Sequence, residues 1–200
     1  MSDDRATLVA EAETALVKAL SLAPNHAFAH LFLGALQIIT NRAAQGMAEC
    51  EQALALDRNL AEAHTQIGTA KYMMGRAREL EAHLHEAFRL SPRDVWAFRW
   101  LCMIGFAKLQ LSADTEAVSW FRRSIEANRN YPLTHFALAA ALALIGLWDD
   151  ARTAAKAGLA IDPSFTIRRF RDGASSDNPA FLAKRERVYE GMRLAGVPEG

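Results

Sequence analysis

One pattern of apolar and small residues recurs along the chain with a period of about 34 residues. It is clearest in residues 132–165, where two apolar-periodic runs are separated by a break and end at Pro163. The pair Leu138–Ala139 recurs at steps of 34, 37 and 34 residues, as Ile104–Gly105, Ile67–Gly68 and Leu33–Gly34. A fixed period of this length indicates a solenoid of helix–turn–helix units, in which each unit covers the apolar face of its neighbour.

Small residues mark the places where the two helices of one unit approach each other. Ala151, at the start of a second helix, recurs at the same steps as Ala117, Leu80 and Gly46. A larger side chain at this position would hold the helices apart. Leu80 departs from the pattern, and it predicts looser packing in the second unit.

On these positions, residues 27–165 resemble the tetratricopeptide repeat family. The resemblance implies an all-α, right-handed superhelix of four repeats, at 27–60, 61–94, 95–131 and 132–165. Residues 1–26 match only the second helix of a repeat, which makes them a half repeat with an uncovered apolar face. Three explanations are open: the chain is a piece of a longer protein, a second copy covers the face, or the segment is frayed.

Two segments depart from the period. The third repeat holds three additional residues around Val95–Ala97, and Asp94 is expected to cap a helix that begins one turn early and carries Trp96. Residues 166–200 are expected to form a linker and a helix that begins at Asn178–Pro179. The apolar face of this helix predicts that it caps the last repeat, with a free regulatory tail as the alternative.

Composition narrows the classes of partner. Lys and Arg number 23, as do Asp and Glu, and this balance argues against nucleic acid, whose phosphates need clustered basic residues. The basic clusters at 122–123 and 168–171 are interpreted as solvated faces or salt-bridge partners, with docking of an acidic partner as the alternative. Without a bilayer-spanning run or a signal pattern, we expect no membrane association and a cytoplasmic location. Cys50 and Cys102 fall at apolar helix positions and are expected to be core residues.

No pattern typical of catalysis or metal binding is present. The sequence lacks Gly-x-Ser-x-Gly, a Gly-rich phosphate loop and His-Glu-x-x-His. His30, His64 and His135 recur at the repeat period, so each ring is expected to pack within its own repeat. Asp149 and Asp150 open a helix, where carboxylates interact favourably with the helix dipole. We therefore expect no enzyme activity, no cofactor and no metal site.

The remaining candidate site is the surface formed by the first helices of the repeats. In the family, these helices line a concave groove that binds peptides or partner helices. The matching positions of this chain are Phe28, Leu31, Ile38, Thr65, Thr69, Tyr72, Met73, Arg99, Phe106, Leu109, Phe136 and Ala140. Leu31 and Ala35 replace the polar pair with which chaperone-binding members grip a C-terminal carboxylate, so that clamp is not expected. The apolar groove is expected to hold a protein or peptide: a partner helix, a second subunit or the chain's own C-terminal helix.

Three further segments resemble a narrower group. Residues 130–133, 162–167 and 187–198 are similar to the C-terminal repeat region of bacterial class III adenylate/guanylate cyclases. The resemblance implies the non-catalytic C-terminal part of such a signalling protein. We therefore expect a protein–protein interaction or scaffold module. The alternative is a homo-oligomerisation module that uses the groove and the N-terminal helix, and the third hypothesis is an enzyme with a site on the solenoid surface.

Overall fold

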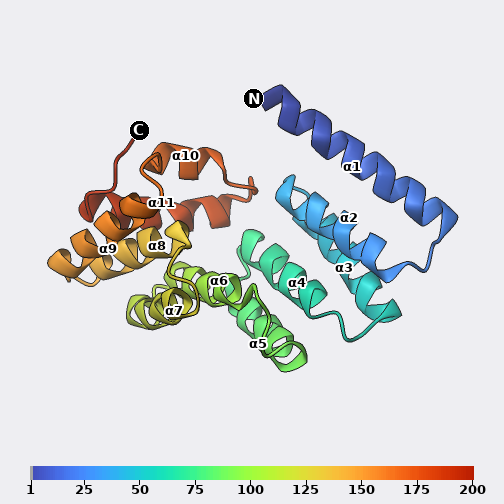
Figure 1. Ribbon diagram of the computed structural model, residues 1–200, viewed down its shortest axis with the longest axis horizontal. Coiled ribbons are helices and arrows are strands. Elements are labelled where there is room, and N and C mark those ends of the chain that lie inside the picture. The colour runs from blue at the N-terminus through green and yellow to red at the C-terminus, as the bar shows by residue number, and fades with distance from the viewer. Residues whose placement is uncertain (1) are drawn as a thin grey trace.

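The computed structural model describes residues 2–200, and the side chains from residue 6 onward. The described residues form helices and turns and no strand. Figure 1 shows a curved row of helices from α1 to α9, with α11 lying against α8 and the short helix α10 against α11. The all-α solenoid predicted from the sequence is confirmed. The elements are α1 (Ser2–Leu22), α2 (Ala27–Ile39), α3 (Ala43–Leu56), α4 (Ala61–Met73), η1 (Ala77–Glu79), α5 (Leu80–Leu90), α6 (Ala97–Gln110), α7 (Asp114–Ala127), α8 (Pro132–Leu144), α9 (Trp148–Ile161), α10 (Ile167–Asp172) and α11 (Pro179–Leu194).

Four helix pairs make up the solenoid, and the turn inside each pair contains one residue with a left-handed backbone. The pairs are α2 with α3, α4 with α5, α6 with α7, and α8 with α9. The left-handed residues are Asn41 (φ 64°), Gly75 (φ 80°), Ser112 (φ 59°) and Gly146 (φ 83°). Glycine adopts this conformation without steric cost, and Asn tolerates it better than most residues. The four positions are 34, 37 and 34 residues apart, which is the spacing of the apolar pattern.

Small residues allow the two helices of a pair to approach closely. A Cβ added to Gly34 would lie 2.6 Å from the carbonyl oxygen of Gly46, on the second helix of the same pair. The matching Cβ on Gly68, in the second pair, would find its nearest atoms at 3.3 Å, one of them the carbonyl oxygen of Leu80. The second pair therefore has the looser packing that Leu80 predicted. Its second helix also begins with a 3-10 turn, η1.

The additional residues of the third repeat lengthen a loop. Helix α6 begins at Ala97, and Val95 and Trp96 lie in the turn before it. The Asp94 carboxylate accepts a hydrogen bond from the backbone N–H of Trp96 at 2.8 Å. This side-chain contact closes a turn over residues 94–96, and the first residue of α6 is therefore Ala97. The expectation that Asp94 caps a helix one turn earlier was wrong.

The C-terminal segment is folded and docked. The Asn178 side chain accepts hydrogen bonds from the backbone N–H groups of Ala180 and Phe181, and it caps α11 as predicted. Helix α11 packs against α8 and, to a lesser extent, α6. Tyr189 and Met192 on its inner face are almost completely buried. The alternative of a free regulatory tail is therefore wrong, and α11 reaches beyond the last repeat.

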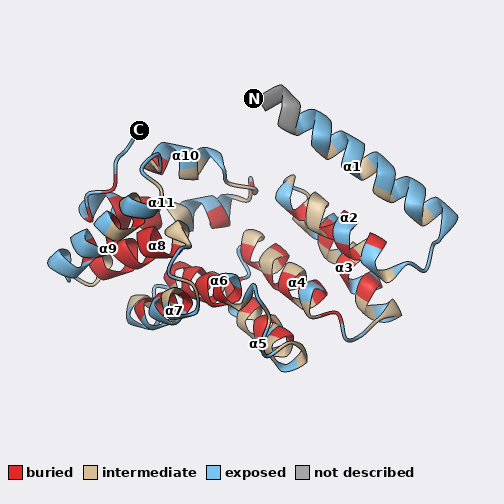
Figure 2. Cartoon of the chain, in the orientation of Figure 1, coloured by how far each residue is buried: buried red, intermediate tan, exposed pale blue. Residues whose placement is uncertain are grey.

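Burial follows this arrangement. Figure 2 shows buried residues concentrated in α6 and α8, whereas α1 is exposed along most of its described length. Helix α8 is enclosed because α7, α9 and α11 all pack on it, and ten of its residues are buried. Among the described residues, no helix combines the length and apolar character needed to cross a membrane.

Candidate functional site: an open groove and a covered groove

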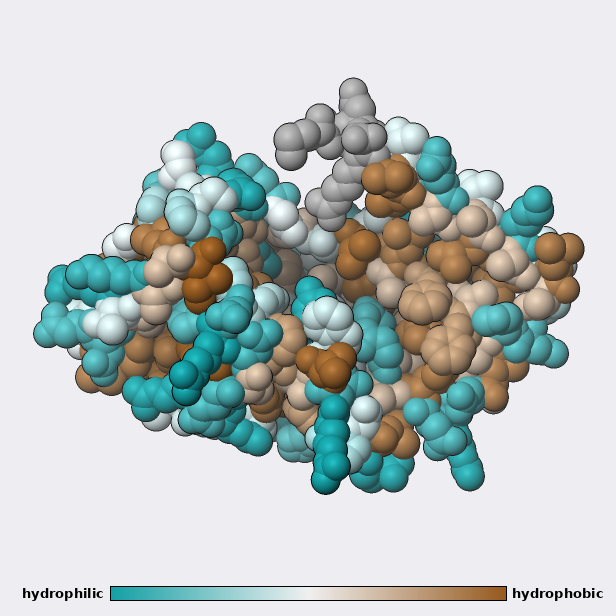
Figure 3. Space-filling view, viewed as in Figure 1, coloured by the Kyte–Doolittle hydropathy of each residue, from teal (hydrophilic) through white to brown (hydrophobic). Residues whose placement is uncertain are grey.

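The first helices of the repeats, α2, α4, α6 and α8, line an open groove with a volume of about 610 Å³. Apolar side chains dominate its lining, and Figure 3 shows such side chains gathered over the α2 side of the molecule. The lining residues are Phe32, Ile39, Glu62, Thr65, Gln66, Thr69, Leu84, Asp94, Trp96, Arg99, Trp100, Cys102, Met103, Phe106, Tyr131 and Leu133. Four residues predicted from the sequence, Thr65, Thr69, Arg99 and Phe106, are therefore brought together in one site.

Helix α2 forms one wall and presents large apolar side chains to solvent. Phe28, Phe32 and Ile39 are 49%, 56% and 46% exposed. The rings of Phe28 and Phe32 lie one helical turn apart, with centroids 6.2 Å from each other. Apolar side chains gathered in this way gain free energy when a partner covers them. Phe32 was not among the residues predicted from the sequence, although its spacing from Phe28 placed it on the same side of the helix.

The floor of the groove is formed by α4 and α6 and holds no free nucleophile. The Thr65 hydroxyl donates to the carbonyl oxygen of Glu62 and the Thr69 hydroxyl to that of Thr65, both at 2.8 Å. Because these hydroxyls donate to the backbone, neither is free to act as a nucleophile. Burial raises the pKa of the Cys102 thiol to about 12, so this sulfur stays protonated and unreactive.

A cationic and aromatic rim closes the groove near the start of α6. The Arg99 guanidinium lies 5.2 Å from the centroid of the Trp96 ring and 5.9 Å from that of Tyr131. Contacts of this kind hold a guanidinium in place while leaving its N–H edges free to donate. Trp96 is half exposed and belongs to the lengthened loop. The additional residues of the third repeat thus extend this rim.

A second part of the groove is covered by the chain itself. The ring of Tyr72 meets that of Phe181 edge to face at 5.3 Å. The backbone of Ala140 lies so close to α11 that a Cβ on Gly191 would come within 2.6 Å of its carbonyl oxygen. Two predicted positions are held through their carbonyl oxygens: Met73 accepts from the Ser176 hydroxyl at 2.8 Å, and Leu109 accepts from the Arg187 guanidinium at 3.5 Å. The C-terminal segment is thus one occupant of the predicted groove.

The other predicted groove residues lie elsewhere. Phe28 is exposed on α2 one helical turn before Phe32 but is not among the lining residues, and Leu31, Ile38 and Phe136 are buried inside the repeats. Ile38 contacts the site left empty by the missing side chain of Gly46, and the Phe136 ring lies over Gly158. Since a glycine opposite each side chain leaves room for it, both turn inward.

Several polar contacts hold α11 over the first helices. Arg187 forms a two-pronged ion pair with Asp114 at the corner between α6 and α7, with one contact at 2.6 Å. At the other end, the backbone N–H of Asp177 donates to the Asn41 side chain at 2.9 Å. Arg185 lies 4.2 Å from the centroid of the Phe170 ring and joins α10 to α11. These contacts tie the C-terminal segment to the first helix pair, to the third pair and to α10.

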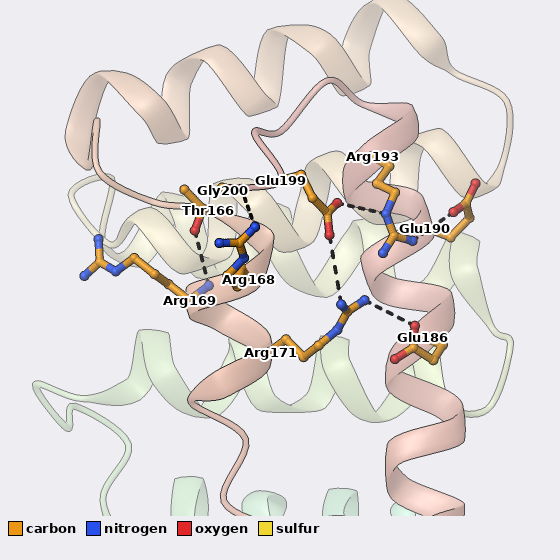
Figure 4. Close-up of polar contacts among 9 residues, drawn as sticks. All are labelled: Thr166, Arg168, Arg169, Arg171, Glu186, Glu190, Arg193, Glu199 and Gly200. Carbon is orange, nitrogen blue, oxygen red and sulfur yellow. Dashed lines mark hydrogen bonds and ion pairs between the residues drawn. The ribbon is translucent and has the colours of Figure 1, made fainter. Parts of the chain in front are cut away.

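The basic cluster around α10 is engaged by the chain's own C-terminal residues. Figure 4 shows Glu199 between Arg171 and Arg193, with its nearer contact to Arg193 at 2.9 Å. Arg168 donates to the carbonyl oxygen of Gly200 at 2.8 Å. Arg171 also meets Glu186 of α11 at 3.4 Å. The cluster therefore has acidic and carbonyl partners within the chain, in keeping with its interpretation as a salt-bridged face.

The recurring histidines each pack within their own surroundings. His30 contacts Glu49 at 2.7 Å and the carbonyl oxygen of Pro24 at 2.9 Å. His135 makes the equivalent carbonyl contact, to Arg129, at 2.9 Å. The His64 ring lies 5.9 Å from that of His83. In the part of the chain that the structure describes, no three His, Cys, Asp or Glu residues gather in a way that could hold a metal ion.

Comparison with known proteins gives fold similarity only. No family model matches the chain, and no curated protein matches it. Solved structures of tetratricopeptide repeat proteins are similar over most of their length. YrrB, a protein of this fold with an unusual peptide-binding site, has 21% identity and a TM-score of 0.60, over 90% of this chain and 95% of its own. The pilus biogenesis factor PilW has 18% identity and a TM-score of 0.75, over 96% and 86% of the two chains. PilF of Pseudomonas aeruginosa has 22% identity and a TM-score of 0.72, over 94% and 82%. The chain thus has the fold of these proteins.

Proposed function

We propose that this protein is a non-catalytic interaction module that binds an apolar segment of another protein in its open groove. The observation that carries the proposal is the groove itself: about 610 Å³, walled by the exposed side chains of α2 and floored by α4 and α6. Its dimensions and apolar lining suit a peptide or a helix. The peptide-binding site of YrrB, a protein of the same fold, supports this use of the solenoid.

The chemistry of the groove indicates what the bound segment contains. Phe32 and Ile39 offer apolar contact along one wall, so the segment carries apolar side chains in series. Arg99 lies at the opposite rim and forms ring contacts with Trp96 and Tyr131. A carboxylate on the segment would find a planar, preorganised donor there. The balanced net charge supports a protein partner over nucleic acid.

The biological setting is a further part of the proposal. The similarity of residues 130–133, 162–167 and 187–198 to cyclase-associated repeat regions supports a role as the regulatory C-terminal part of a bacterial adenylate/guanylate cyclase-like signalling protein. Such a role places the protein in the cytoplasm. A cyclase-type regulatory module would need a groove for a second protein segment and no catalytic groups of its own.

The test is a selection of random 12-residue peptides on the full chain, followed by fluorescence anisotropy with the enriched peptides. We expect Phe32→Ala to weaken binding about tenfold, since truncating a central aromatic anchor costs roughly 1–2 kcal/mol. Trp148→Ala is the matched control, because Trp148 is similarly exposed (45%) but lies outside the groove. Enriched peptides whose affinity is unchanged by Phe32→Ala, or reduced equally by Trp148→Ala, would overturn the proposal.

A further inference from the structure

The N-terminal helix α1 carries an apolar face that its neighbour does not cover. Helix α1 packs on α2 through the half-buried residues Val9, Glu13, Leu16 and Leu20. The adjacent face of the helix holds five apolar side chains, and all five are exposed: Leu8, Ala12, Ala15, Ala19 and Leu22. Leu8 is 61% and Leu22 78% exposed. Exposed leucines at both ends of one face indicate a surface that a partner covers.

The four complete repeats show that the positions equivalent to this face of α1 pack against another helix. The position of Ala12 is buried in all four complete repeats, where it is Gly46, Leu80, Ala117 and Ala151. The position of Ala19 is likewise buried in all four, as Ala53, Ala87, Ser124 and Gly158. In each complete repeat the first helix covers the second helix along this face. The exposed face of α1 therefore has the shape and chemistry for one further helix.

The two ends of the solenoid differ in this respect. At the far end, the middle of the solvent face of α9 carries the exposed polar side chains Asp149, Arg152 and Lys156, with the exposed Trp148 and Ile161 only at the two ends of the helix. A polar outer face of this kind keeps a terminal repeat soluble. Helix α1 instead presents alanines and leucines, so the N-terminal end of the solenoid has the character of an interface.

The spacing on α1 matches the seam of a two-helix coiled coil. Residues 8, 12, 15, 19 and 22 follow one another at steps of four and three, the period at which two helices stay in contact. Alanines at the centre allow close approach and leucines fill the ends. Ala15 lies at the midpoint, so an antiparallel pair with its twofold axis there places Leu8 of one copy beside Leu22 of the other.

Charge complementarity selects a second copy in this orientation. Glu11 and Lys18 flank the seam on one side, and both are exposed. With the twofold axis at Ala15, Glu11 of each copy lies beside Lys18 of the other, which gives two symmetric contacts of opposite charge. In a parallel pair the two copies of each flanking residue would lie on opposite sides of the seam, so Glu11 and Lys18 would not meet and both contacts would be lost.

We propose that α1 is an interface for a second copy of this chain, in which the two α1 helices pair antiparallel and each lies on the face that a first helix covers in the complete repeats. The surface goes beyond the peptide groove and does not depend on it. One helix from each copy makes an interface below the roughly 800 Å² per partner of standard complexes. We therefore expect association in the micromolar range.

The test is the mass of the full chain in solution, measured by light scattering and sedimentation from about 1 to 200 µM, a range that brackets micromolar dissociation constants. We expect a rise from monomer to dimer. Ala15→Glu should abolish it, because two carboxylates would meet on the axis, while the helix itself is unharmed. Val17→Glu is the matched control on another exposed face of α1 and should leave the dimer unchanged. A monomer at every concentration, or a dimer that persists in Ala15→Glu, overturns the proposal.

Exchanged charges test the antiparallel register. Glu11→Lys and Lys18→Glu should each weaken self-association, and mixing the two variants should restore it, because every flanking pair then becomes attractive. Ala15→Cys should form a disulfide-linked dimer on oxidation, and Val17→Cys should not. The native Cys50 and Cys102 are buried and do not interfere. A mixture that associates no better than either variant alone, or equal cross-linking at residues 15 and 17, overturns the antiparallel pair.

Discussion

At the scale of single residues, the helix crossings depend on where a Cβ can be accommodated. Gly34 and Gly68 occupy the same position in the first and second repeats. A Cβ on Gly34 would meet backbone and Cys50 Sγ at 2.6 Å, whereas a Cβ on Gly68 would meet nothing closer than 3.3 Å. The same sequence position is therefore tightly constrained in one repeat and loosely constrained in the next.

We expect Gly34→Ala to destabilise the protein by about 1–3 kcal/mol, because the helices must move apart to admit the methyl group. Gly68→Ala is the matched control. It should cost less than about 1 kcal/mol, since the gain in helix propensity offsets the close contact. Urea unfolding followed by circular dichroism measures both. Equal losses for the two substitutions would contradict this explanation of the crossings.

The His64–His83 pair should make stability depend on pH. Burial lowers the pKa of both imidazoles below 6.5, with the charge of Arg89 a further lowering influence on His64 and that of Lys71 on His83. Since the folded state disfavours their protonation, their contribution is complete above about pH 6.5 and is lost as the pH falls below it. For His30, burial lowers the pKa but hydrogen bonds to Glu49 and Pro24 outweigh it, so the net shift is upward and its contribution is lost as the pH rises.

His64→Leu should accordingly reduce the loss of thermal stability between pH 7.5 and pH 5.5. Leucine fits the site, because Leu101 occupies the same position in the third repeat. His135→Leu serves as the control, since the His135 ring contacts a backbone carbonyl and lies outside the pair. Melting temperatures at the two pH values give the result. An unchanged pH dependence in His64→Leu would remove the pair as its source.

At the scale of elements, α11 is the helix on which the division of the groove depends. It covers Tyr72 and Ala140 and leaves Thr65 and Arg99 open. Its position is fixed by close packing at Gly191 and by the ion pair between Arg187 and Asp114. The Asp114 side chain is only 11% exposed. Its carboxylate is therefore less hydrated than one on the surface, and it needs the Arg187 guanidinium to compensate its charge.

Arg187→Met should therefore lower the free energy of unfolding by about 1–2 kcal/mol and loosen α11, because the largely buried carboxylate of Asp114 loses its counter-charge. Arg193→Met removes a pair of ion contacts of the exposed kind and should cost about 0.5 kcal/mol or less. Hydrogen exchange along α11 reports the loosening. Equal protection of α11 in the two variants would show that packing alone holds the helix.

At the scale of the whole molecule, the period in the sequence was sufficient to predict the four helix pairs and the positions of their small residues. It did not locate α11, because contacts such as that between Ser176 and Met73 join residues 103 apart and have no local pattern. It also could not decide which apolar residues face the groove. Ile38 and Phe136 match the family's groove positions, but Gly46 and Gly158 give them room to turn inward.

The whole molecule is thus a solenoid in which α1 presents an apolar face at the N-terminal end and α9 a mainly polar face at the other end. Its own C-terminal helix covers part of the groove. We place the partner segment in the open part of this groove, between α2 and α6. The part that α11 covers takes no part in binding on this proposal, because Tyr72 and Ala140 already have an intramolecular partner.

The most direct measurement is the change in amide NMR signals of the labelled 22.0 kDa chain when a selected peptide is added. We predict that the shifts gather at Phe32, Thr65, Thr69 and Arg99, and that those of α9 do not move. Shifts confined to α1 or α9, or a displacement of α11 with no change at Thr65 and Thr69, would contradict the assignment of the open groove as the binding site.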